Sequence, residues 1–233
     1  MYQIQPVAIA RTPFREKFAI PRQPMLAPAA IGTIELQPPF DQAAAFEGLE
    51  LNSHVWLIFL FHQALPDPDK PPRLRVRPPR LGGNERMGVF ATRSSHRPNG
   101  IGQSLVKLES INGTSIRVSG IDLMDGTPII DIKPYIPYAD CLPHATSALA
   151  PDAPAAIQVE WSSEARLQVE VQQARLQQPL QELIEQCLAQ DPRPAYQTPQ
   201  PEREYGAGFY DVDVRWHYPT ADCIRVLAVE KLA

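Results

Sequence analysis

The chain has 233 residues, 44% of them hydrophobic and 21% charged, so it can bury a core and is too apolar to be disordered throughout. The formal net charge of −4 by itself disfavours a nucleic-acid partner. The three cysteines are far apart and odd in number, which excludes a disulfide framework and a paired-cysteine metal site.

The first sixty residues predict short strands. Residues 2–10 and 31–36 alternate between apolar and polar side chains, as half-buried strands do. Asp41 is placed to cap a short helix that runs through residue 47. The apolar run 55–61 (VWLIFLF) predicts a strand that is buried on both faces.

No membrane-directed segment is visible in the sequence. The amino terminus lacks a basic stretch followed by an apolar one, so we expect no signal peptide. The longest apolar run is far below the roughly 20 residues that span a bilayer. We therefore expect a cytoplasmic protein without membrane contacts.

Residues 64–85 form a long loop with six prolines between Pro66 and Pro79. Loops of this length inside compact domains are usually functional. Residues 87–92 (MGVFAT) are strand-like.

A hairpin is predicted next. Asn112-Gly113 separates two runs, 105–111 and 115–121, and Asn-Gly between such runs is the strongest local hairpin signal. Asp125-Gly126 marks the next turn, and residues 129–136 then alternate as a strand.

The composition changes at residues 143–156, which are rich in proline and alanine and predict a linker. The predicted elements beyond it are a strand at 157–161, a helix at 164–178 capped by Ser162 or Ser163, a helix from Pro179 to about 190, and antiparallel strands at 212–216 and 224–229. We therefore predict two domains, 1–145 and 156–233.

Strands and helices do not alternate, which disfavours a doubly wound parallel sheet. Many short strands with regular turns favour a barrel or a sandwich. The residues therefore predict a strand-rich barrel or sandwich, followed by a pair of helices and a hairpin.

Charge is unevenly distributed. Residues 64–97 hold eight basic residues against three acidic ones, and residues 11–22 hold four against one. Arginine outnumbers lysine in the first segment, and guanidinium groups bind phosphate oxygens in pairs. An anion site on an otherwise acidic protein is the functional interpretation, and a solvated loop with incidental arginines is the alternative.

Common catalytic motifs are absent, including the glycine-rich nucleotide loops, the HExxH zinc site and the GxSxG serine elbow. What remains is a set of dense loop segments at predicted strand ends: 21–24, 62–63, 93–102, 123–135 and 191–196. Each also has a structural interpretation as a turn, a solvated strand face or a helix end. Their coincidence favours a site.

Together these segments resemble one known family, the tRNA (adenine-37-N6)-methyltransferases named TrmO, TsaA or YaeB. The resemblance is carried by FREKFAIPRQP, LIFLFHQ, VRPPRLGGNERMGVFATRSSHRPNGIGQSLV, DLMDGTPIIDIKPYIPYA, LAQDPRPAY and DVDVRW, and it covers roughly residues 4–229. It implies a single antiparallel β-barrel with a small carboxyl-terminal α+β domain, acting as a homodimer. It also implies S-adenosylmethionine as cofactor and N6-threonylcarbamoyladenosine at position 37 of a threonine tRNA as substrate.

Carried onto this sequence, the resemblance predicts cofactor contacts at Pro21, Arg22, Gln23, His62, Gln63, Arg93, Gln103, Leu123, Met124, Asp125 and Gly126. Backbone groups of residues 123–126 can read an adenine edge, and Arg93 or Arg22 can hold a carboxylate. We expect no metal.

Attack by the ureido N6 nitrogen is helped by a base and by close, in-line positioning. The candidates for these roles are Asp125, Asp131, Asn99, Lys133 and Tyr135. Lys133 and Arg97 are also candidates for holding the threonyl carboxylate or a phosphate. Arg97, Arg193 and Tyr196 are predicted to contact tRNA by charge and stacking.

Three alternatives stay open at this point. One is a barrel that binds RNA without chemistry, and another is a methyltransferase with a different substrate. A hydrolase is the weakest, because the five histidines show no metal-ligand spacing and no serine or cysteine occupies an elbow motif.

Overall fold

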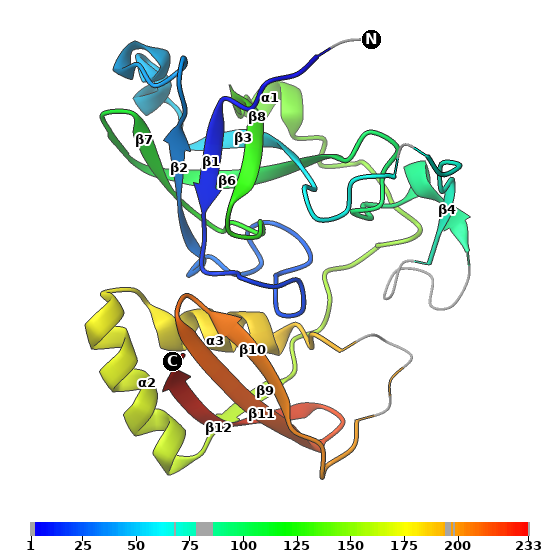
Figure 1. Ribbon diagram of the computed structural model, residues 1–233. Helices are drawn as coiled ribbons and strands as arrows, with labels where there is room; N and C mark the ends of the chain where they lie inside the picture. The colour runs from blue at the N-terminus through cyan, green and yellow to red at the C-terminus, as the bar shows by residue number, and fades with distance from the viewer. Residues whose placement is uncertain (1–2, 68, 78–85, 194–196, 198, 233) are drawn as a thin grey trace.

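The computed structural model describes residues 3–67, 69–77, 86–193, 197 and 199–232. A closed barrel forms the amino-terminal part, a smaller sheet with two helices forms the carboxyl-terminal part, and an extended segment joins them (Figure 1). This arrangement confirms the mainly β fold with a small α+β unit, and it resolves the choice between barrel and sandwich in favour of the barrel.

Six antiparallel strands close the barrel in the order β1-β2-β7-β6-β3-β8. Their bounds are β1 Ala8–Arg11, β2 Ile31–Leu36, β3 His54–Leu60, β6 Ile101–Asn112, β7 Ser115–Ser119 and β8 Thr127–Pro134. Alternate side chains point into the barrel, as the two-residue period of a strand requires. Ile34, Leu57, Val106, Ile116 and Ile129 are fully buried there.

Strand β3 differs from its prediction. Val55, Leu57 and Phe59 are buried, whereas Trp56 and Ile58 between them are only partly covered. The prediction of burial on both faces is therefore wrong, because the outer face of a barrel strand is covered by few other elements.

The hairpin at Asn112-Gly113 is confirmed by the pairing of β6 with β7. Gly113 has φ +58°, the left-handed conformation that glycine adopts without a steric cost. Strand β1 is shorter than predicted, since Pro6 has no N–H to donate to a ladder.

Short elements decorate the barrel. They are the 3-10 helices η1 (Ala43–Phe46), η2 (Leu49–Leu51) and η3 (Val89–Ala91), the two-residue strands β4 (Arg75–Val76) and β5 (Met87–Gly88), and the helix α1 (Pro137–Asp140). Gln42, not Asp41, precedes η1, and its side chain makes no capping hydrogen bond, so the predicted cap is wrong. The strand predicted at 87–92 continues only to Gly88 and then turns into η3.

The carboxyl-terminal sheet has the order β10-β11-β12-β9. Its strands are β9 Gln158–Trp161, β10 Tyr205–Phe209, β11 Val212–Thr220 and β12 Cys223–Lys231, and its helices are α2 Ser163–Leu176 and α3 Leu180–Ala189. The Ser162 Oγ accepts a hydrogen bond from the Ala165 N–H at 3.0 Å, which confirms the predicted cap of α2. Strand β10 was not predicted, because its two glycines weaken the strand pattern.

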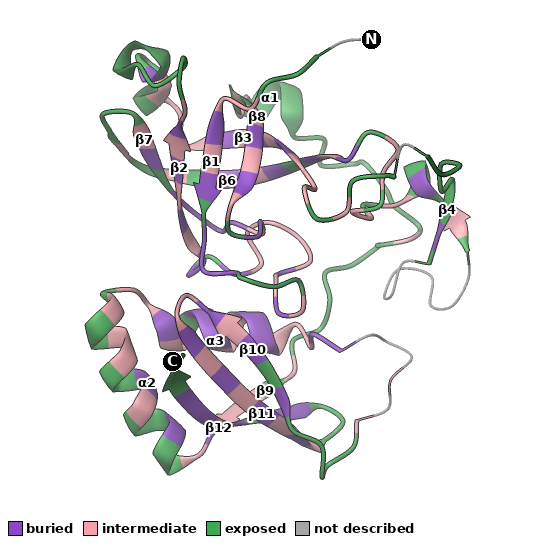
Figure 2. Ribbon diagram, viewed as in Figure 1, coloured by how far each residue is buried: buried purple, intermediate pink, exposed green. Residues whose placement is uncertain are grey.

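Residues 12–30, between β1 and β2, belong to the barrel part and pack against the carboxyl-terminal part (Figure 1). Phe14 forms an isolated bridge with Phe209, and the Tyr210 N–H donates to the Pro13 carbonyl at 2.8 Å. Phe18 stacks on Trp216 with ring centroids 5.9 Å apart. Buried residues are therefore continuous from the barrel through this segment into the carboxyl-terminal sheet (Figure 2).

Candidate active site

The barrel topology gathers most of the predicted site at one end. Because neighbouring strands are antiparallel, the ends of β1, β3 and β7 and the starts of β2, β6 and β8 lie at the same rim. The segments at this rim are 12–30, 61–63, 97–100 and 120–126. These contain most of the residues predicted to bind the cofactor, although Thr12 and Asp125, which meet there, are 113 residues apart in sequence.

Residues 120–126 cross the end of the barrel from β7 to β8. The Ile121 N–H donates to the Ala30 carbonyl, and the Thr12 Oγ1 donates to the Leu123 carbonyl at 2.8 Å. The Asp125 Oδ1 accepts from the Thr12 N–H at 2.9 Å, while the Asp125 N–H donates to the Phe14 carbonyl. These bonds hold the Asp125 carboxylate, which is otherwise exposed, at a defined place on the rim.

These hydrogen bonds also limit which backbone groups of residues 123–126 could bind the edge of an adenine, the role predicted for them. The N–H groups of Asp125 and Gly126 and the carbonyls of Leu123 and Met124 already have partners within the protein. A ligand would therefore use a second lone pair of these carbonyls or the other backbone groups of the segment.

Segment 12–30 connects the other predicted cofactor contacts. The Gln23 Oε1 accepts a short hydrogen bond from the Arg93 Nη1, and the Lys17 Nζ donates to the Gln63 carbonyl at 3.2 Å. Pro21 is buried and Arg22 is half-buried. The structure thus brings Gln23 and Arg93 together and places Gln63 beside Lys17 of the same segment, with His62 in the turn that follows β3.

Asp122 is a candidate that the sequence analysis did not single out. Its Oδ1 accepts a hydrogen bond from the buried Ser104 Oγ at 2.6 Å. Burial raises the pKa of Asp122 to about 6, against the lowering effects of the Ser104 bond and the Arg93 charge. A carboxylate perturbed in this way beside a predicted binding segment is characteristic of a functional site. Its only signal in the sequence is that it directly precedes residues 123–126.

The turn at residues 97–100 lies beside the end of β3. The Phe61 N–H donates to the Gly100 carbonyl at 2.7 Å, and Asn99 is exposed. The Arg97 guanidinium donates to the Thr92 carbonyl at 2.8 Å and lies 6.0 Å from the Phe90 ring centroid.

A basic hollow of about 290 Å³ opens next to this turn. Its polar lining includes Gln63, Lys70, Arg73, His96 and Arg97, with Asp67 as the acidic member. Lys70 pairs with Asp67 at 2.8 Å, so the excess positive charge comes from the two arginines. The hollow adjoins the rim through Gln63.

Four of the predicted site residues lie outside the segments that form the rim. Asp131 and Lys133 are exposed on β8, with Lys133 Nζ 3.7 Å from Asp131 Oδ2, and Gln103 is exposed on β6 between buried Gly102 and Ser104. Tyr135 lies at the opposite end of the barrel, where its N–H donates to the His54 carbonyl and its ring contacts Trp56. Strand β8, which separates Asp125 from Tyr135, has eight residues and is therefore roughly 26 Å long.

Of the predicted tRNA contacts beyond Arg97, Tyr196 lies outside the described residues. Arg193 is 6% exposed, and its guanidinium bonds to Asp191 inside the protein. Direct contact between Arg193 and RNA stays a prediction, but a buried guanidinium is poorly placed for it.

Within the described residues, the structure contains no cluster of three side chains suited to holding a metal ion. No helix in the same part of the chain is long and apolar enough to cross a membrane.

Comparisons with known proteins cover nearly the whole chain. The model of the tRNA-methyltransferase O N-terminal domain matches residues 9–141, and that of the TrmO C-terminal domain matches residues 154–232. The RcsF protein of Pseudomonas aeruginosa, named as an S-adenosylmethionine-dependent methyltransferase, is 62% identical over 98% of this chain and 97% of its own. The Escherichia coli tRNA (adenine(37)-N6)-methyltransferase is 44% identical over 98% of both chains. A crystal structure of TrmO from Pseudomonas aeruginosa superposes with a TM-score of 0.83 at 54% identity over 98% of both chains.

Proposed function

The chain belongs to the TrmO family of S-adenosylmethionine-dependent tRNA methyltransferases, and from that premise we propose that it methylates N6 of N6-threonylcarbamoyladenosine at position 37 of threonine tRNA. The observation that carries the proposal is the convergence of segments 12–30, 61–63 and 120–126 on one barrel rim. We propose that the reaction takes place in the cytoplasm.

The chemistry of the rim fits this cofactor. S-adenosylmethionine would supply a methyl group on a positively charged sulfur, together with a carboxylate, an ammonium group and an adenine. The Arg93 guanidinium can bind the carboxylate, and the half-buried Asp122 carboxylate can favour the positive charges. Gln23, which is already bonded to Arg93, and Gln63 can complete the polar contacts.

Base and positioning roles are assigned to the rim residues. Asp125 is held by the Thr12 N–H through one oxygen and is exposed, so it can accept the N6 proton of the substrate. Asn99, exposed on the neighbouring turn, can orient the ureido group. The basic hollow beside Arg97 can receive the threonyl carboxylate or a phosphate, because guanidinium groups bind such oxygens in pairs.

Asp131, Lys133 and Tyr135 remain proposed participants. Asp131 and Lys133 are exposed on β8 and Tyr135 lies at the opposite end of the barrel, so we propose that they act on a substrate bound to a second copy, in keeping with the homodimer implied by the family. Large exposed apolar side chains, Tyr138 at 92% and Leu142 at 71%, follow Tyr135 and supply surface for such an interface.

The test combines a methylation assay with ligand binding. Purified protein is incubated with S-adenosylmethionine and with threonine tRNA that does or does not carry the threonylcarbamoyl group, and the nucleosides are analysed by mass spectrometry. We expect methylation only of the modified tRNA. We expect Asp125→Asn and Asn99→Ala to lower the single-turnover rate about 100-fold while leaving calorimetric binding of S-adenosylhomocysteine within about twofold.

Asp131→Ala and Lys133→Ala are measured in the same way and test the two proposed participants on β8. Absence of heat on titration with S-adenosylhomocysteine would mean a barrel that only binds RNA. Equal methylation of unmodified tRNA would mean a different substrate. Wild-type rates in all four variants would refute the catalytic assignment.

A further inference from the structure

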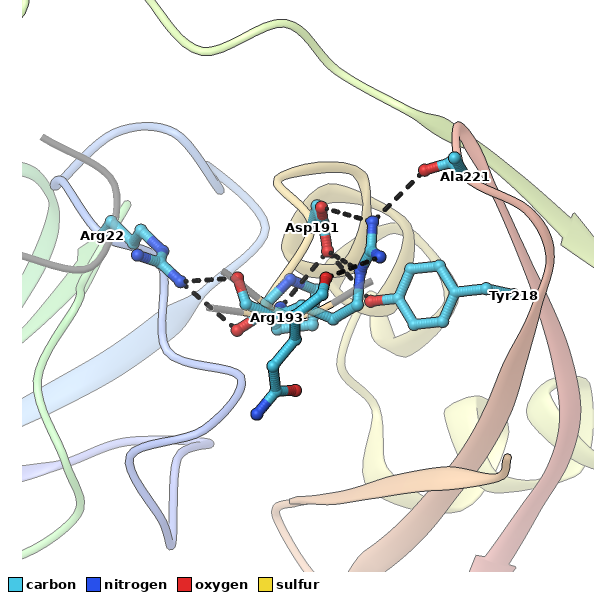
Figure 3. A network of polar contacts seen from close by, with 7 residues as sticks. Arg22, Asp191, Arg193, Tyr218 and Ala221 are labelled. Carbon is cyan, nitrogen blue, oxygen red and sulfur yellow. Dashed lines mark hydrogen bonds and ion pairs between the residues drawn. The ribbon is translucent and has the colours of Figure 1, made fainter. Parts of the chain in front are cut away.

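Hydrogen bonds to the carboxyl-terminal domain hold the Pro21–Gln23 loop, which we propose contacts the cofactor. Pro21, Arg22 and Gln23 lie in segment 12–30, and on the side facing the carboxyl-terminal domain the Arg22 guanidinium donates from Nη2 to two backbone carbonyls. These are the carbonyls of Pro192 and Arg193, each at 3.3 Å (Figure 3). The two carbonyls belong to the turn that follows α3, about 170 residues away in the sequence.

A buried ion pair holds that turn. The Arg193 Nε and Nη2 donate to the two oxygens of Asp191, both at 2.9 Å, and a further bond from Nη2 reaches the Ala221 carbonyl at 3.2 Å (Figure 3). Tyr218 donates its hydroxyl to Asp191 Oδ1 at 3.0 Å, and its ring centroid lies 4.1 Å from the Arg193 guanidinium carbon. Burial alone would lower the pKa of Arg193, but the bonds to Asp191 outweigh it and raise the pKa.

The geometry of this network suits a rigid support. Paired bonds between a guanidinium and a carboxylate fix the relative orientation of both groups. Tyr218 is fully buried on β11, so the network is anchored in the sheet of the carboxyl-terminal domain. Asp191 has φ +49°, a conformation that non-glycine residues adopt rarely and that its bonds hold in place.

Other contacts from the same domain meet the same loop. The Gln186 Oε1 accepts from the Ala29 N–H at 2.8 Å, and the Gln190 Nε2 donates to the Leu26 carbonyl at 3.3 Å. The Glu16 Oε1 accepts from the Gly208 N–H at 2.9 Å. Segment 12–30 therefore lies between the barrel rim and the carboxyl-terminal domain, with specific bonds to both.

We propose that Asp191, Arg193 and Tyr218 are positioning residues for the cofactor: they hold the Asp191–Arg193 turn, whose carbonyls fix Arg22 and with it the Pro21–Gln23 loop. The carboxyl-terminal domain thereby preorganises a site whose ligand contacts lie on the barrel. This inference rests on the proposed use of S-adenosylmethionine.

The test uses the full-length protein with Asp191→Asn, which keeps a residue tolerant of positive φ and removes the charge. The calorimetric Kd for S-adenosylhomocysteine should rise about fivefold to tenfold. In steady state, KM for S-adenosylmethionine should rise by the same factor with kcat nearly unchanged. Backbone amides of residues 14–29 should exchange hydrogen faster than in the wild type, without ligand present.

Tyr218→Phe is the milder second variant, because it removes one hydroxyl and keeps the ring, and it should raise Kd by about two- to threefold. Arg225→Gln is the control: it breaks the ion pair between Arg225 and Glu160 in the same domain, at 2.7 Å, without touching segment 12–30. The control should bind S-adenosylhomocysteine like the wild type, whatever its effect on the melting temperature.

The outcomes separate the two proposals. Wild-type affinity and wild-type exchange in both Asp191→Asn and Tyr218→Phe would overturn the positioning role while leaving the methyltransferase function intact. Equal weakening by Arg225→Gln at a matched loss of stability would also overturn it. Absence of binding by the wild-type protein would overturn the proposed function, and the positioning role with it.

Discussion

The ionised side chain of Asp122 lowers the stability of the fold and at the same time supplies a negative charge to the proposed site. Its carboxylate is half-buried beside Ser104, and burial raises its pKa to about 6 from an ordinary value of 3.8. The folded protein therefore binds the proton more tightly than the unfolded chain. The stability that this provides is complete below about pH 4 and is lost as the pH rises through 6.

Replacing Asp122 with asparagine removes this dependence, since the amide resembles the protonated carboxyl and can still accept the Ser104 hydrogen bond. We expect Asp122→Asn to be more stable than the wild type by roughly 3 kcal/mol at pH 7.5, and the difference to shrink toward zero near pH 4. Urea unfolding at the two pH values measures this. A difference that is independent of pH would show that burial does not raise the pKa of Asp122.

At the scale of elements, the rim depends on close packing between β3 and β6. Gly102 on β6 pairs with Phe59 on β3, and the rings of Phe59 and Phe61 meet edge to face at 5.0 Å over it. A Cβ at Gly102 would lie 2.9 Å from Phe61 Cε2 and closer still to the Phe59 ring. The glycine is therefore required by the approach of two aromatic rings and not by its backbone angles.

We expect Gly102→Ala to lower the free energy of unfolding by about 1–3 kcal/mol, because the buried Phe59 ring and the partly buried Phe61 ring must move to admit the methyl group. Gly88→Ala is the matched control, since a Cβ there has nothing within 4 Å, and its effect should stay within about 0.5 kcal/mol. Denaturant unfolding of both variants decides. Equal stability of the two would mean that the Phe59–Phe61 pair yields without cost.

For the whole molecule, charge and domain arrangement act together. The chain is acidic overall, yet residues 64–97 are strongly basic in sequence, and Lys70, Arg73 and Arg97 from this range line the hollow next to the rim. Arg73 and Arg77 are exposed in this basic segment. An acidic body with a basic approach directs a polyanion toward one end of the barrel.

This arrangement predicts that tRNA affinity falls with salt. The double variant Arg73→Gln, Arg77→Gln should reduce the steepness of log K against log salt by about 1–2, because each phosphate contact contributes roughly 0.7–0.9. Arg215→Gln is the control, since that guanidinium lies within 4.0 Å of carboxylates of Glu204, Asp213 and Glu230. Filter binding at several salt concentrations measures the slopes. Identical slopes in the double variant and the wild type would refute the contact between this basic segment and tRNA.

Features that depend on local chemistry could be predicted from the sequence. The Asn112-Gly113 hairpin, the Ser162 cap and strand β2 were predicted correctly, because turn angles, capping bonds and a two-residue period are set by neighbouring residues. The family, with its mainly β fold and its cofactor, was also readable, since its long motifs are linear. The two domain ranges and the individual site roles remain predictions.

Which of these segments meet depends on how the whole chain closes in three dimensions. Closure of the barrel brings residues 120–126 onto segment 12–30 and leaves Tyr135 at the opposite end, although Tyr135 is closer to Asp125 in sequence than Thr12 is. The burial of Arg193 and the cost of ionising Asp122 likewise arise from groups far along the chain. Burial and electrostatic fields depend on distance in space, and spacing in a sequence measures that distance only within one element.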